Sequence, residues 1–81
     1  MTVLVGESSN FIVVKFSNTK SGTDKIFIMN LIGRSMVEHQ YSGEESMIIN
    51  EVSSLSNGLY IVIAKDANGK ILDSSKFMLT K

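Results

Sequence analysis

The sequence predicts an all-β domain, a seven-strand antiparallel β-sandwich of the immunoglobulin or fibronectin-III type. Val, Ile and Thr supply 20 of the 81 residues and Ala only two, and branched side chains fit a pleated sheet better than a helix. The six glycines lie ten to sixteen residues apart, which leaves room for strands between turns and little room for helices. Short strands of this number bury their apolar faces by packing two sheets together, and 81 residues make one such domain.

The individual strands are apolar runs between turn residues. In the second run Ile12, Val14 and Phe16 alternate with other residues and so share one face. Residues 59–64 are apolar at every position, which indicates a central strand covered on both faces; at six residues this longest apolar run is far short of the roughly 20 that span a membrane as a helix. The expected strands are residues 2–5, 10–16, 25–31, 35–41, 47–50, 59–65 and 70–79, the last either continuous or broken at residues 74–75.

Two of the expected turns are alike. Each begins with a residue whose side chain can cap its own turn, continues with a glycine that tolerates a left-handed backbone, and then has a cation. We interpret them as one hairpin type used twice in a single sandwich. The turn residues concerned are Asn30, Gly33 and Arg34 in the first and Asp66, Gly69 and Lys70 in the second.

The chain contains no proline, so its sheet edges must be protected from unwanted pairing by other means. Lys15 and Lys65 each lie within an otherwise apolar strand. Two interpretations stay open: the lysines guard edge strands, or they simply face solvent.

Composition excludes several classes of function. Eight basic and eight acidic residues give a net charge of zero, which argues against binding to nucleic acid and against a polybasic membrane anchor. The chain has no cysteine, so it has no disulfide, zinc–thiolate site or thiol nucleophile. We therefore expect no cofactor.

Catalytic and metal-binding patterns are weak. His39 is the only histidine and lies in a polar stretch, which indicates a plain surface residue, because zinc needs three or four ligands. Glu44 and Glu45 follow Gly43, and such turn carboxylates are normally solvated. No Gly-x-Ser-x-Gly nucleophile motif occurs. We expect no enzymatic activity.

Carbohydrate binding is the structural alternative. Sandwich modules of that kind stack sugar rings on flat aromatic platforms. The chain has no tryptophan, and Tyr41, Phe11 and Phe77 are the aromatic residues left to form a platform.

The segment 55–63 predicts a corner of the sandwich. Leu55 would plug one end of the core and Gly58 would permit a tight entry into the strand. The ring of Tyr60 would pack inside while its hydroxyl bonds back to the loop backbone.

These elements together resemble the C-terminal sorting domain of the type IX secretion system of Bacteroidetes, the Por secretion family. The resemblance covers residues 10–81 and departs from the family pattern in lacking an Asn-Pro near the start and a proline before Gly58. The matching residues, in the family's order and spacing, are Gly33, Arg34, Leu55, Gly58, Tyr60, Gly69, Lys70, Lys76 and Lys81.

The resemblance implies a non-enzymatic signal rather than a catalyst. Residues 1–81 would be one sorting domain that follows a larger secreted cargo protein. The translocon would recognise it in the periplasm and carry it across the outer membrane to the cell surface or medium, where a surface sortase would cut upstream of its first strands. Lys76 and Lys81 would hold their ammonium groups in water, adding little to stability, and would be the first contacts for the machinery. An immunoglobulin- or fibronectin-III-like accessory module that binds carbohydrate or protein is the alternative.

Overall fold

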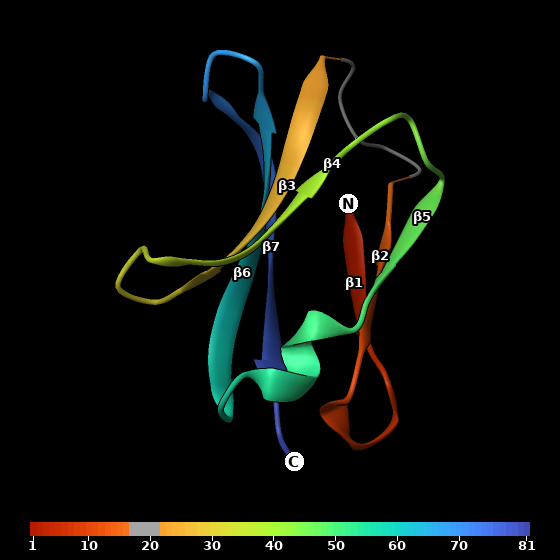
Figure 1. Ribbon diagram of the computed structural model, residues 1–81, viewed down its shortest axis with the longest axis vertical. Coiled ribbons are helices and arrows are strands. Elements are labelled where there is room, and N and C mark those ends of the chain that lie inside the picture. The colour runs from red at the N-terminus through yellow and green to blue at the C-terminus, as the bar shows by residue number, and fades with distance from the viewer. Residues whose placement is uncertain (17–21) are drawn as a thin grey trace.

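The computed structural model describes residues 1–16 and 22–81, which form seven antiparallel strands in two sheets packed face to face (Figure 1). Every pair of neighbouring strands is antiparallel, so the predicted sandwich is confirmed. The three-stranded sheet has the order β1 (Thr2–Val5), β2 (Ile12–Lys15), β5 (Ser46–Ile49). The four-stranded sheet has the order β4 (Ser35–Gln40), β3 (Thr23–Asn30), β6 (Gly58–Asp66), β7 (Ile71–Leu79).

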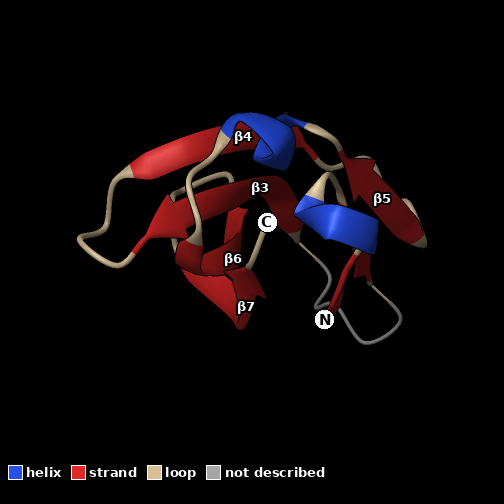
Figure 2. Cartoon of the chain, turned by 90° about the horizontal axis from the view of Figure 1, so that it is seen from below, coloured by secondary structure: helices blue, strands red, loops and turns tan. Residues whose placement is uncertain are grey.

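Helical structure in the described part of the chain amounts to two short 3-10 turns, η1 (Glu7–Ser9) and η2 (Glu51–Ser54). Both lie at the end of the sandwich where the C-terminus emerges, and Figure 2 views the molecule from that end. No helix among the described residues is long and apolar enough to cross a membrane.

The core lies between the two sheets and follows the predicted alternation. Each strand turns every second side chain inward, because successive residues of a strand point to opposite faces. The largest fully buried side chains are Ile12, Val14, Ile26, Ile28, Ile49, Val52, Val62 and Leu79.

Strand β6 is central, as predicted, because it pairs with β3 on one side and β7 on the other. Its outer face is only partly covered: Ile63 is buried, whereas Leu59 and Ile61 are half-buried. The expected cover on both faces is therefore present only in part on the outer face, because neighbouring side chains, and no third layer in the described part of the chain, shield it.

The lysines do not guard edges. Lys15 lies on β2 and Lys65 on β6, and both strands are central in their sheets. Lys15 is exposed, and the ammonium of Lys65 lies 4.7 Å from the centre of the Phe27 ring in a cation–π contact. Strand β7 is continuous through residues 74–75, so the alternative of a broken strand is also wrong.

The two similar turns have the same hydrogen bonds. The amide of Asn30 donates to the carbonyl of Arg34 (3.1 Å), and that of Asp66 donates to Lys70 (3.0 Å). The Asn30 Oδ1 atom accepts two further amides of its turn, and Asp66 Oδ1 does the same in the other. Gly33 adopts a φ of 85°, close to the 84° of the second turn. The prediction of one hairpin type used twice is confirmed, with the two turns at opposite ends of the sheet (Figure 1).

Candidate functional site

The predicted corner is present at the start of β6. Tyr60 is 5% exposed, and its hydroxyl donates to the backbone carbonyl of Ser56 at 2.7 Å. Its ring stacks on Phe77 of β7, with 5.8 Å between the ring centres. Gly58 enters the strand with a φ of 150°, a conformation that is strained for any other residue, and Leu55 is buried against the core. The corner therefore joins the η2 loop to β7 through one side chain.

Lys81 closes the same end of the molecule. Its ammonium donates to the carbonyls of Val52 (3.0 Å), Ser53 (2.8 Å) and Leu55, and its amide donates to Asn57 Oδ1 at 3.0 Å. The last carbonyls of a short helical turn have few partners within the turn, although Val52 O does accept the Leu55 amide, so a lysine that reaches them acts as a cap. Lys81 is exposed, as predicted, but its ammonium is bound to these backbone carbonyls and not free in water.

Thr80, the residue before Lys81, is also held by hydrogen bonds within the fold. The hydroxyl of Ser9, in η1, donates to the carbonyl of Thr80 and accepts its amide, at 3.1 and 3.0 Å. Ser9 is buried and has a φ of 55°. We call this set of contacts made by residues 80–81 the C-terminal clasp. Nothing in the sequence near Ser9 indicated it, because the partners lie 71 residues apart.

The Lys76 side chain lies in solvent, as predicted. It lies exposed on the outer face of β7, paired in register with Ile61 of β6. Its ammonium makes no hydrogen bond or ion pair with any residue that the structure describes. The two family lysines of the last segment therefore differ: the Lys81 ammonium is bound within the fold, and the Lys76 ammonium is free in solvent.

The Gly33–Arg34 turn lies beside the corner. Asn30, where this turn begins, pairs in register with Tyr60, and residues of both segments line one open hollow of about 330 Å³. Gly69 and Lys70 lie at the far end of the same sheet, next to the start of β3. The structure thus gathers most of the family-motif residues at one end, whereas Lys76 lies along β7 opposite Ile61, and Gly69 and Lys70 lie at the far end.

The aromatic platform that the carbohydrate-binding alternative requires does not form from Tyr41, Phe11 and Phe77. Phe77 is 5% exposed, and Phe11 precedes β2, with its ring against Gly6. Tyr41 packs on Phe16, which follows β2, with 4.7 Å between the ring centres. The three aromatic rings are therefore either buried or at opposite ends of a strand, and they present no common flat surface.

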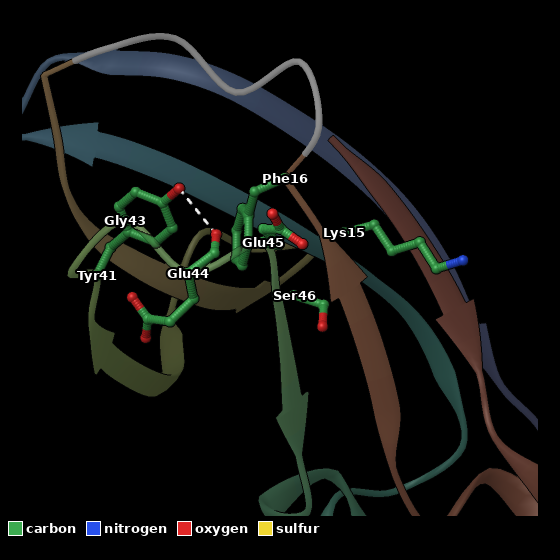
Figure 3. Close-up of a pocket in the computed structure, with 7 residues that line it drawn as sticks. All are labelled: Lys15, Phe16, Tyr41, Gly43, Glu44, Glu45 and Ser46. Carbon is green, nitrogen blue, oxygen red and sulfur yellow. Dashed lines mark hydrogen bonds between the residues drawn. The ribbon is translucent and has the colours of Figure 1, made fainter.

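A cleft of about 650 Å³ opens beside Tyr41 (Figure 3). The Tyr41 hydroxyl donates to the carbonyl of Glu44 at 3.0 Å. Both Glu44 and Glu45 are exposed, and Figure 3 shows their carboxylates pointing in different directions. This is the solvated turn that the sequence predicts, and the two carboxylates do not converge on a common point.

His39 lies on edge strand β4 and is partly exposed. Its Nε2 atom is 2.9 Å from Glu51 Oε2; the two atoms are close enough for an ion pair when the imidazole is protonated, but they are not aligned as a hydrogen bond. Among the described residues, no group of three or more His, Cys, Asp or Glu side chains gathers as a metal site would require.

Comparison with known proteins identifies the family. The family model described as "Secretion system C-terminal sorting domain" matches residues 8–79, nearly the whole chain. No curated protein and no solved structure matches significantly. The match includes every motif residue except Lys81. Domains of this family are the export signals of type IX secretion and mark proteins for the cell surface or the medium; they are not known as enzymes. The chain belongs to the family of secretion system C-terminal sorting domains.

Proposed function

We propose that the domain acts as a passive export signal whose recognition surface is the end of the sandwich that carries the C-terminal clasp. The observation that carries this proposal is the meeting of the Gly33–Arg34 turn, the Tyr60 corner and the clasp at that end. Recognition by a translocon needs a rigid surface and does not need catalytic groups. The clasp and the corner supply the rigidity, because both join the η2 loop to the last strand.

Two cations without internal partners are available to a binding partner, Arg34 beside the recognition end and Lys76 on the outer face of β7. Neither the Arg34 guanidinium nor the Lys76 ammonium has a polar partner among the described residues. A partner that supplies carboxylates can therefore bind them without breaking an internal ion pair. In this proposal Gly69 and Lys70 serve the second turn: the glycine provides its φ of 84° and the lysine amide donates to Asp66.

The position of the N-terminus supports a preceding cargo protein. Met1 lies at the end of β1 away from the C-terminus, at about mid-height in Figure 1, since Thr2 pairs with Lys15 and the chain reaches η1 only after β1. A cargo domain attached before residue 1 would leave the recognition end uncovered. We propose that a surface sortase then cuts upstream of β1 and releases the cargo from its signal.

The test is export of a fluorescent cargo placed between a signal peptide and this domain in a Bacteroidetes host. We expect cargo in the medium or on the surface from the intact host, and cargo held in the periplasm when the domain or the translocon is absent. Lys76→Ala should reduce export without lowering the melting temperature. Equal export with and without the domain would refute the sorting role of this chain.

A further inference from the structure

The two matched turns differ at their tips. Leu31 and Ile32 form the tip of the β3–β4 turn and are 64% and 86% exposed. The same two positions of the β6–β7 turn are Ala67 and Asn68, and the backbone hydrogen bonds are the same in both. The turn geometry therefore does not require apolar side chains at these positions. We call Leu31 and Ile32 the apolar tip.

The apolar tip continues into other accessible apolar surface. Met36 of β4 is 40% exposed, and Leu59 of β6 is half-buried. Together with the tip and the Ser56–Asn57 loop, they line the hollow of about 330 Å³. A continuous apolar surface with a projecting knob beside a hollow is typical of a protein interaction site rather than of scattered surface residues.

The charge near this surface is positive, because Arg34 lies beside it and no carboxylate lines the hollow. Arg34 follows the tip, and its guanidinium has no hydrogen bond or ion pair with the part of the chain that the structure describes. The lining residues include no carboxylate, and the acid of neighbouring β4, Glu38, is paired with Lys25 at 3.4 Å. A partner that covers the surface must bring its own negative charge to balance the arginine.

We propose that the apolar tip, the adjoining hollow and Arg34 form a docking site for a protein of the secretion machinery. The partner surface that fits has an apolar pocket for Leu31 and Ile32, a side chain that enters the hollow, and a carboxylate placed against Arg34. The inference rests on the proposed function, because it names the chemistry of the partner at the recognition end. A lipid surface fits less well, since a membrane anchor needs several cations rather than one, and a bilayer has no shaped group to fill the hollow.

The test replaces the apolar tip of the β3–β4 turn with the residue types found at the same positions of the β6–β7 turn. Leu31→Ala with Ile32→Asn copies the tip that the second turn already accepts, so the melting temperature should not fall. Export of the fluorescent cargo should drop at least fivefold. The matched control is Ile48→Thr, which removes an aliphatic side chain that is 61% exposed on β5 and should leave export within twofold of the parent.

Charge reversal tests the carboxylate. Arg34→Glu should reduce export at least fivefold, whereas Lys70→Glu, the equivalent change in the second turn, should change it less than twofold. Equal effects of the two reversals would overturn the assignment of a partner carboxylate to Arg34.

The remaining outcomes separate the two proposals. If the parent domain directs export and the tip variant exports equally well, the docking site is refuted and the sorting role stands. If the parent domain directs no export, both fail together. Flotation of the 81-residue domain with phosphatidylethanolamine–phosphatidylglycerol vesicles gives the lipid alternative: co-flotation that the tip variant loses would make lipid the partner and overturn the protein docking site.

Discussion

Removing the Lys81 ammonium should destabilise the domain although the residue lies on the surface. Lys81→Met keeps most of the side-chain stem and deletes the group that donates to the carbonyls of Val52, Ser53 and Leu55. Hydrogen bonds to a charged group contribute about 1.5–3 kcal/mol, but these carbonyls can regain some contact with water, so we expect a loss of about 1–2 kcal/mol in the free energy of unfolding. In a domain of this size that lowers the melting temperature by about 5–15 °C.

The matched control is Lys76→Met on β7. The Lys76 ammonium has no partner among the described residues, so this variant should remain within about 0.5 kcal/mol of the parent. Urea and thermal unfolding, followed by circular dichroism, measure both variants. Indistinguishable melting of the Lys81 variant and the parent, or equal losses for the two lysines, would refute the capping role. Because Lys81 is part of the fold, a combined change at both lysines cannot separate recognition from stability.

Two further variants test the fold at other points. Tyr60→Ala should cost about 3–5 kcal/mol, as expected for a buried aromatic residue, and Tyr60→Phe about 1 kcal/mol for the lost bond to Ser56; urea melts that match the parent would show that the ring is not buried. Gly6→Ala should cost about 1–3 kcal/mol, because its new Cβ would come within 2.4–2.6 Å of the Phe11 ring and push it out of place. Parent-like stability of that variant in the same melts would mean that Phe11 can move freely.

Local patterns predicted the parts of this fold that depend on neighbours in sequence. The alternation of Ile12, Val14 and Phe16 gave the inward face of β2, because strand side chains alternate whatever the partner strand is. Asn30 and Asp66 predicted the two turns, because the side-chain oxygen of each accepts hydrogen bonds from backbone amides no more than four residues away. The Tyr60 hydroxyl likewise bonds only four residues back.

Features that join distant segments were not predictable in this way. The sequence left open whether Lys15 and Lys65 lie on edge strands, because the order of strands in a sheet depends on pairings that a single strand does not encode. The Lys81 cap joins residues 26 to 29 positions apart, and the Ser9–Thr80 contact joins residues 71 apart. The apolar tip was visible in the sequence as Leu31 and Ile32, but its significance depends on the exposure and on the comparison with the second turn.

The place of β7 in the chain determines when the domain can fold. A polypeptide that is made from its N-terminus has β1 to β6 available before β7, and until then the Tyr60 ring lacks Phe77 and the core lacks Leu79. Strand β6, the central strand of its sheet, has one side without a partner during that time. The η2 loop is also uncapped until residue 81 is present. The domain therefore cannot complete its fold until β7 and residue 81 have been synthesised. A folded domain consequently indicates that all of the chain before these residues has already been made.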